Sequence, residues 1–261
     1  MLLDAEQFAD AQKALEKFIA DYTKHELIDQ ATYQLGFTKM KQDQWPAALV
    51  NFAKVPAESQ WRDDALYQSA WCQKGAGKNQ DALPHYEELL VEFPESSLAN
   101  TSLFELAELK YEARKFNDVI RRLQELIEKK PKKDLRARAQ QLLGLVYYDQ
   151  KNFAEALLSF QEVVRTKKPT IRSKGDELGA EAQFLMGKCY FEQKMFDEAI
   201  EEYKKMETGF PFPQWQSKAI FEMAMTLDRK GDKAEAQEQF KRLVEKFPDT
   251  PAAADAKAKL D

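Results

Sequence analysis

The sequence is poor in residues that interrupt helices. It has only nine glycines and ten prolines among 261 residues, whereas Ala, Leu, Glu, Lys and Gln recur throughout. Because these common residues favour helices and glycine and proline disfavour them, the composition predicts an all-α chain without long linkers.

Long apolar runs and a basic surplus are also missing. The uncharged apolar runs are far shorter than the roughly 20 residues needed to cross a bilayer, so no membrane-spanning segment is expected. The formal net charge of −5 offers no general attraction for nucleic acid, and no nucleic-acid partner is expected. Two cysteines, Cys72 and Cys189, are too few for a disulfide framework or a zinc site. We predict that both are unpaired packing residues.

Motifs for catalysis or cofactor binding are absent. His25 and His85 lie far apart in the repeat described below, and residues 74–79 lack the first glycine and the Ser/Thr of a phosphate-binding loop. Neighbouring carboxylates such as Glu87 and Glu88 point about 100° apart on a helix and do not converge on one metal ion. The sequence therefore predicts no enzyme, no cofactor and no small-molecule substrate.

What the sequence has instead is internal self-similarity, the signature of a repeat architecture. Segments with an aromatic residue three positions before a small residue begin at Phe8, Trp45, Phe116, Phe153 and Phe196, and related segments without the aromatic begin at Asn79 and Lys233. The small residues are Ala11, Ala48, Ala82, Val119, Ala156, Ala199 and Ala236, with successive separations of 37, 34, 37, 37, 43 and 37 residues. One supersecondary unit is repeated.

Each unit is expected to hold two helices joined by a short turn. A large apolar residue follows each small residue by four positions, which places both on one helix face. Twelve positions before the small residue lies a second one: Gly36, Ala70, Ala107, Gly144, Gly187 and Ala224. Small residues on both helices predict a closely packed antiparallel hairpin. Phe93-Pro94 and Phe247-Pro248 predict helix ends, because proline cannot continue a helix.

The pattern resembles the tetratricopeptide repeat. The residues that carry the resemblance include Leu143-Gly144 and Tyr147 in one unit and Ala199, Tyr203 and Pro211 in the next. The resemblance implies a right-handed α-solenoid of helix-turn-helix repeats that forms a single domain over residues 1–261. The repeats are expected at about 29–62, 63–99, 100–136, 137–179, 180–216 and 217–250.

The chain ends are expected to differ from the repeats. Residues 2–21 match only the second helix of a unit, so we expect an orphan helix there, belonging to a longer protein whose preceding helix lies upstream. Residues 251–261 are expected to form a capping helix that begins after Thr250-Pro251. Thirteen or fourteen helices are expected in all.

The spacing of the units is similar to one group of these proteins. Frequent 37-residue spacing and junctions such as Phe93-Pro94-Glu95-Ser96 are most similar to bacterial envelope repeats, for example the Tol-Pal accessory protein and the lipoprotein of outer-membrane β-barrel assembly. This similarity implies a periplasmic or outer-membrane-associated location and a possible membrane-associated complex. A cytoplasmic location is the alternative.

The resemblance also implies that the first helices line a concave groove. Ten of eighteen residues at the fifth, ninth and twelfth positions of the units are aromatic, against 11% of the chain. The predicted peptide-binding residues are Tyr33, Phe37, Tyr67, Trp71, Phe104, Tyr111, Tyr148, Phe184, Phe191 and Phe221. The rings could instead pack against neighbouring hairpins. Phe37 and Trp71, both at ninth positions, favour binding, because packing explains that position least. No unit has the lysine and asparagine pair of a chaperone-tail clamp.

A second candidate surface is basic. It comprises Arg121, Arg122, Lys129, Lys130, Lys132, Lys133 and Arg136. Such a run is either a solvated face or a patch for an acidic protein, lipid headgroups or nucleic acid, and it lacks a nucleic-acid motif.

The function predicted from these features is a non-catalytic scaffold that binds a protein or peptide, within a bacterial envelope complex. Two alternatives remain open: a structural, self-assembling repeat segment of a larger protein, and an adaptor for an acidic partner that uses the basic surface. The sequence leaves the oligomeric state unspecified.

Overall fold

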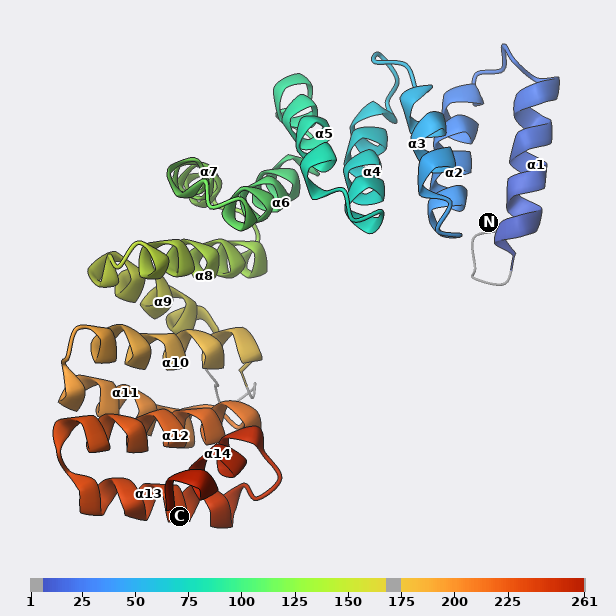
Figure 1. The fold of residues 1–261 in the computed structure, drawn as a ribbon. Helices are drawn as coiled ribbons and strands as arrows, with labels where there is room; N and C mark the ends of the chain where they lie inside the picture. The colour runs from blue at the N-terminus through green and yellow to red at the C-terminus, as the bar shows by residue number, and fades with distance from the viewer. Residues whose placement is uncertain (1–6, 168–174, 261) are drawn as a thin grey trace. The chain divides into compact units, whose positions relative to one another are not determined.

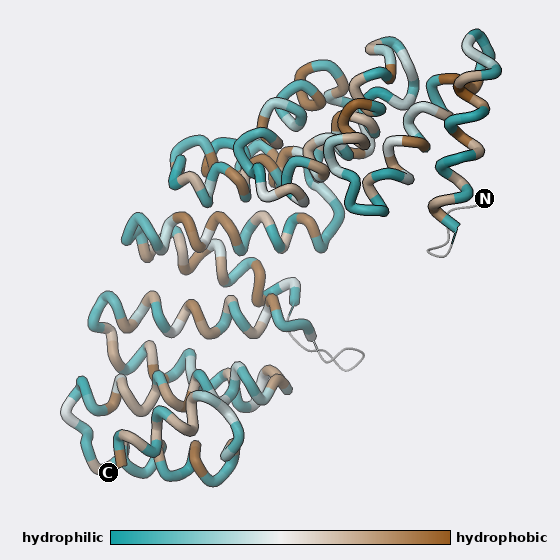
Figure 2. The backbone as a smooth tube through the Cα atoms, turned by 45° about the vertical axis from the view of Figure 1, so that its right-hand side comes forward, coloured by the Kyte–Doolittle hydropathy of each residue, from teal (hydrophilic) through white to brown (hydrophobic). Residues whose placement is uncertain are grey.

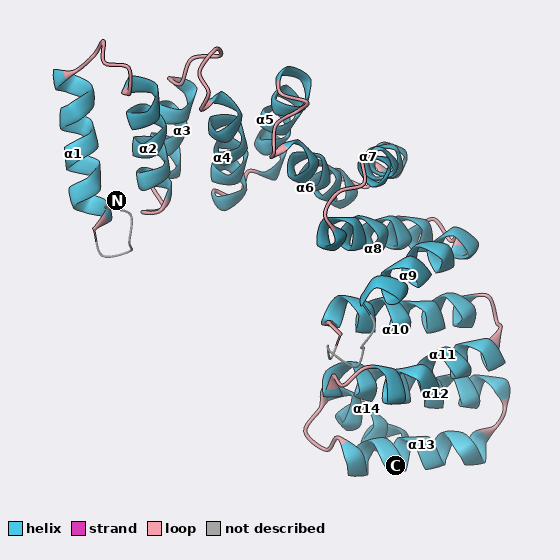
Figure 3. Ribbon diagram, turned by 180° about the vertical axis from the view of Figure 1, so that it is seen from behind, coloured by secondary structure: helices cyan, strands magenta, loops and turns pink. Residues whose placement is uncertain are grey.

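The computed structural model describes residues 7–167 and 175–260, and within these ranges it contains fourteen α-helices and no strand (Figures 1 and 3). The helices are α1 Phe8–Asp21, α2 Ile28–Met40, α3 Trp45–Ala53, α4 Arg62–Gly75, α5 Asn79–Glu92, α6 Ala99–Glu112, α7 Phe116–Glu128, α8 Lys133–Asp149, α9 Phe153–Lys167, α10 Glu177–Glu192, α11 Phe196–Gly209, α12 Pro213–Lys230, α13 Lys233–Lys246 and α14 Pro251–Leu260. The prediction of an all-α chain is confirmed.

The chain divides into two compact units. The N-terminal unit is Met1–Asp118 and the C-terminal unit is Val119–Asp261. Within the N-terminal unit each helix from α1 to α5 packs on the one that follows it, and α2 also contacts α4. The C-terminal unit repeats this order from α8 to α14, with further contacts of α8 with α10 and of α10 with α12. First helices of successive hairpins therefore lie side by side within each unit.

The ends of the chain follow the same packing. Helix α1 packs on α2, as an orphan second helix would, and the start of the predicted 2–21 helix lies outside the described residues. Helix α14 packs on α13 and α12 and buries three alanines, while Asp261 lies outside the described residues. Figure 2 shows hydrophobic residues recurring in short stretches along the helices, separated by hydrophilic ones. Second helices such as α13 therefore have one face for their neighbours and one for water, whereas the first helix α6 is buried at every position from Ser102 to Ala107.

The small residues of the first helices are in contact with large residues of the second helices. A Cβ atom on Gly36 would lie 2.7 Å from the nearest ring carbon of Phe52, and one on Gly144 would lie 2.5 Å from Phe160. Phe52 and Phe160 are 1% and 0% exposed. The glycines therefore set the distance between the two helices of these hairpins.

We expect Gly144→Leu to destabilise the C-terminal unit by about 1–3 kcal/mol, because the new side chain overlaps the Phe160 ring and forces α8 away from α9. Gly209→Leu is the matched control, since a Cβ there meets nothing within 4 Å. Hydrogen exchange should show the loss of protection first in α8 to α10, because each hairpin packs only on its neighbours. Equal loss of protection through α14 would contradict this expectation.

The hairpin turns share one backbone geometry. Asp43, Arg114, Lys151 and Lys194 adopt φ values of 55–61°, and Gly77 and Gly231 stand at the equivalent turn position with φ of 73° and 104°. In each turn the next residue donates its backbone N–H to a carbonyl five residues earlier, for example from Gln44 to Lys39 at 3.0 Å. This is the Schellman arrangement, which satisfies the last carbonyls of a helix. It brings the end of every first helix close to the start of its second helix.

Candidate functional site

The fifth-position rings of the predicted stripe pack on the second helix of their own hairpin. The ring centroids are 5.8 Å apart for Tyr33 and Phe52, 5.9 Å for Tyr67 and Tyr86, 5.8 Å for Phe184 and Tyr203, and 5.7 Å for Phe221 and Phe240. Each partner follows its ring by 19 residues, so the contact recurs with the repeat. Packing between the two helices of each hairpin therefore explains why these positions are aromatic.

Two of the predicted binding residues lie in the core. Phe104 is 2% exposed and Phe184 is 9% exposed. Phe184 is covered by Tyr203 and by Trp215, whose ring centroid lies 5.6 Å away. The structure therefore corrects the prediction for these two residues, because neither ring has enough free surface to form part of a binding site.

The twelfth-position rings pack on the aromatic residue that opens the second helix. Tyr111 lies 6.0 Å from Phe116, Tyr148 lies 5.6 Å from Phe153, and Phe191 lies 5.8 Å from Phe196, measured between ring centroids. All three rings are partly buried. They keep some surface, but the hairpin turn holds them in place, and the same contact appears in both units.

The ninth-position rings differ from the rest. Phe37 is partly buried, lies 6.5 Å from Tyr33, and carries the Lys41 ammonium 5.1 Å above its ring. Trp71 is 45% exposed, the most exposed aromatic of the predicted stripe. An indole exposed to this extent leaves a large apolar surface in water, and tryptophan is enriched in binding sites.

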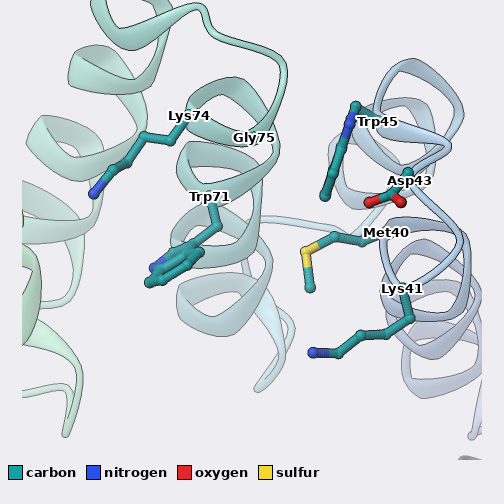
Figure 4. Close-up of a pocket in the computed structure, with 7 residues that line it drawn as sticks. All are labelled: Met40, Lys41, Asp43, Trp45, Trp71, Lys74 and Gly75. Carbon is teal, nitrogen blue, oxygen red and sulfur yellow. The ribbon is translucent and has the colours of Figure 1, made fainter. Parts of the chain in front are cut away.

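Trp71 forms one wall of a hollow in the N-terminal unit, which we call the tryptophan slot. Its lining residues are Met40, Lys41, Asp43, Trp45, Trp71, Lys74 and Gly75, and its volume is about 490 Å³. In Figure 4 Trp71 lies on α4 on one side of the hollow, and Met40 and Trp45, from the end of α2 and the start of α3, lie on the other side. The lining surface is mostly apolar, with charged groups at its edges.

Three local features shape the slot. Gly75 ends α4 beneath the Trp45 indole, and a Cβ on Gly75 would lie 3.1 Å from that ring. Met40 is 8% exposed and is packed in the core cluster of the first hairpin. The left-handed turn at Asp43 leads the chain directly from Met40 to Trp45. The slot thus results from helix ends that the repeat places side by side.

The charged groups at the slot differ in whether they have partners within the chain. The Lys74 ammonium lies 2.5 Å from the Glu105 carboxylate and 5.3 Å from the centre of the Trp71 ring, and Figure 4 shows its side chain extending away from Met40 and Trp45. Lys41 and Asp43 are exposed, and within the described residues neither forms an ion pair or a side-chain hydrogen bond. They stand on separate edges of the slot.

A second hollow in the N-terminal unit, of about 250 Å³, is lined by residues of α3, α4 and α5, including Arg62, His85 and Glu88. Its charged groups already have partners. Arg62 binds the Glu88 carboxylate at 2.6 Å and donates to the Val55 carbonyl at 3.2 Å. Burial lowers the pKa of His85, so its imidazole is neutral near pH 7. The charged groups of this hollow therefore stabilise the packing of α3, α4 and α5 rather than remaining available for a ligand.

The predicted basic surface lies within the C-terminal unit, on α7, on the segment after it and on the start of α8. Lys129 pairs with Glu125 at 3.1 Å and Arg136 with Glu162 at 3.7 Å. Lys130, Lys132 and Lys133 are exposed. Arg121 is exposed and Arg122 partly buried, and both have interactions with other residues. Part of the positive charge is therefore balanced within the chain.

The described part of the chain has few groups suited to metal binding or nucleophilic chemistry. No group of three or more His, Cys, Asp or Glu residues there could hold a metal ion. Cys72 and Cys189 are free and buried, as predicted, and burial raises the pKa of each thiol to about 12. A thiol with that pKa has almost no thiolate at neutral pH and is a poor nucleophile.

We therefore expect both cysteines to be unreactive in the native chain. Ellman's reagent at pH 8 should detect no thiol within minutes in native buffer and both thiols after denaturation, because each side chain is 0% exposed. A Lys78→Cys variant, with its new thiol in an exposed turn, is the positive control. Prompt modification of Cys72 in the native protein would contradict this expectation.

No helix within residues 7–167 and 175–260 is both long and apolar enough to cross a bilayer.

Comparisons with known proteins agree with the hairpin architecture. A family model described as a tetratricopeptide repeat-like domain matches residues 51–214, and a tetratricopeptide repeat model matches residues 218–250. No curated protein sequence matches the chain significantly.

Solved structures show the same fold. One is the C-terminal part of a TPR repeat-containing protein from Cytophaga hutchinsonii, with a TM-score of 0.73 and 16% identity over 95% of this chain and 94% of that one. PilF of Pseudomonas aeruginosa has a TM-score of 0.59 and 17% identity over 88% and 97% of the two chains. YrrB, described as a TPR protein with an unusual peptide-binding site, has a TM-score of 0.57 and 20% identity over 79% and 97%. The family model covers more than half of the sequence, and the chain belongs to the tetratricopeptide repeat-like family.

Proposed function

We propose that this protein is a non-catalytic scaffold that binds a partner polypeptide through the tryptophan slot of its N-terminal unit. The observation that carries the proposal is Trp71, an indole 45% exposed that faces an apolar hollow rather than the core. Tetratricopeptide repeats serve as protein-interaction scaffolds, and the similar protein YrrB is described as having a peptide-binding site.

The size and composition of the slot support a polypeptide ligand. A volume of about 490 Å³ accommodates one large apolar side chain with part of its main chain. Phe37 lies on α2, one turn before Lys41, so it can extend the apolar surface beside the slot. A few rigid rings with little rotamer entropy to lose are enough to anchor a peptide with micromolar affinity.

The test is a selection of peptides from a random display library on the full chain. Peptides that bind should form photo-crosslinks with a benzophenone amino acid introduced in place of Lys41, at the edge of the slot. The same group in place of Val91, an 80% exposed residue on α5, is the matched control and should give no crosslink. Crosslinks only at Val91, or peptides that bind only the C-terminal unit, would refute the proposed site.

The cellular location is a separate proposal. The 37-residue spacing and the Phe-Pro junctions, similar to those of bacterial envelope repeats, support a periplasmic or outer-membrane-associated complex. Fractionation of the source cells, with the protein followed by antibody, tests this. Recovery with cytoplasmic marker proteins would overturn it.

A further inference from the structure

We propose that the tryptophan slot selects a polypeptide segment in which a bulky apolar residue stands next to an acidic residue, with Lys41 pairing with the ligand's carboxylate. This inference rests on the proposed function, because it specifies which ligand the slot takes. It depends on how charged groups are placed around the two indoles.

The apolar part of the ligand follows from the walls. Trp71 on one side and Met40 with Trp45 on the other leave a gap between them (Figure 4). The Trp71 ring lies 6.4 Å from the Tyr67 ring, and among the described residues it makes no ring contact with Trp45 on the other side of the hollow. An aliphatic or aromatic side chain inserted there would contact both walls and remove much of the exposed Trp71 surface from water.

Two rings at or beside the slot, Trp71 and Phe37, are each already approached by one of the chain's own lysines. The Lys74 ammonium lies 5.3 Å from the centre of the Trp71 ring, and the Lys41 ammonium lies 5.1 Å from that of Phe37. A cationic ligand would be repelled by both ammonium groups and would have to displace them from the rings. The two ammonium groups therefore disfavour a quaternary ammonium or lysine side chain beside Trp71.

Lys41 is the group that favours an anion. Within the described residues its ammonium has no carboxylate partner, whereas Lys74 is bound to Glu105 at 2.5 Å. The end of α2 and the start of α3 meet at this turn, so their opposite helix dipoles largely cancel and the side chains set the local charge. Asp43 lies beside Trp45 on the other edge, away from the Lys41 ammonium (Figure 4). A ligand carboxylate beside Lys41 thus gains an ion pair.

The experiment uses short peptides with acetyl and amide ends and the full chain. Leucine at the centre is flanked by aspartates, serines or lysines, and two further peptides carry serine or trimethyllysine at the centre between aspartates. Binding is followed by the indole N–H signals of Trp71 and Trp45, identified with Trp71→Phe and Trp45→Phe variants. The aspartate-flanked leucine peptide should bind about tenfold tighter than the lysine-flanked one at low salt.

Charge variants on the two edges give a matched pair. Lys41→Glu should weaken the aspartate-flanked peptide about tenfold and leave the serine-flanked peptide nearly unchanged. Asp43→Asn should not weaken either peptide, and asparagine keeps the left-handed backbone at φ 57°. Lys41→Gln is the milder variant and should show an intermediate loss.

The outcomes separate the two proposals. If leucine peptides shift the Trp71 signal regardless of their flanks, or if the trimethyllysine peptide binds best, the acidic specificity is wrong while the slot remains a binding site. If none of the peptides shifts Trp71 at concentrations up to about 1 mM, where even weak peptide binding is detectable, this inference is overturned. Peptides selected from the display library that crosslink at the slot would then still support the proposed function.

Discussion

Phe160→Ala is expected to lower the free energy of unfolding of the C-terminal unit by about 3–5 kcal/mol, the largest effect of any single substitution considered for this protein. The ring is 0% exposed and lies against Gly144 of the preceding helix. It belongs to a buried cluster with Val163 on α9 and with Met186 and Cys189 on α10. Removing it leaves a cavity between three helices that cannot close, since the hairpin backbone is held by its turn.

The measurement is chemical denaturation combined with hydrogen exchange of the α8 to α10 amides. Phe153→Ala is the matched control, because the same residue type at the start of the same helix is only partly buried and should cost clearly less. An equal loss for Phe160→Ala and Phe153→Ala, or a loss below about 1 kcal/mol at Phe160, would contradict the packing described for the repeat.

The helix pattern was predictable because it depends on local spacing. The small residue at Gly144 and the large one at Phe160 are separated by 16 positions in the chain, and the same pair recurs as Gly36 and Phe52. Such spacing determines which faces meet, whatever the distant parts of the chain do. The order of the helices and the hairpin contacts could therefore be deduced without knowledge of side-chain positions.

The aromatic stripe was predicted less well, because register alone does not reveal burial. Tyr33 and Phe184 share a position, yet Phe184 is covered by Trp215 and is 9% exposed, whereas Tyr33 is partly buried and stacks on Trp61 at 5.3 Å. The covering tryptophans precede or open the next first helix, outside the three positions used for the prediction. Each of these fifth-position rings is followed 19 residues later by an aromatic ring on the second helix, and this spacing is the sequence signal that indicates packing.

The slot itself was also missed in part. Trp71 and Met40 hold ninth and twelfth positions of their units, but the pattern predicts Trp45 only as a repeat-defining residue. The contact of Gly75, at the end of α4, with Trp45, at the start of α3, depends on the left-handed hairpin turn between α2 and α3. Four of the hairpin turns have a non-glycine residue at this left-handed position. Aspartate is among the residue types enriched at positive φ, but most aspartates adopt negative φ, so Asp43 alone does not predict this turn.

Trp71→Ala is expected to weaken binding of a slot ligand by about 2 kcal/mol, or about thirtyfold in Kd, while changing the free energy of unfolding by less than about 1 kcal/mol. The indole has nearly half of its surface in water, so its removal creates no cavity in the core. A bound ligand would cover that surface, and the loss would then appear in the complex. The relevant ligands are the library peptides that crosslink at the slot.

Isothermal calorimetry gives the binding side of this prediction and thermal denaturation the stability side. Val91→Ala, which truncates an 80% exposed apolar residue on the next helix, should change neither quantity by a measurable amount. Phe160→Ala should show the opposite pattern, with stability lost and slot affinity kept, since it lies in the other unit. If Trp71→Ala instead lowered the melting temperature as much as Phe160→Ala and left the affinity intact, Trp71 would be a packing residue. The exposed lysines at 130, 132 and 133 would then be the next surface to test for a partner.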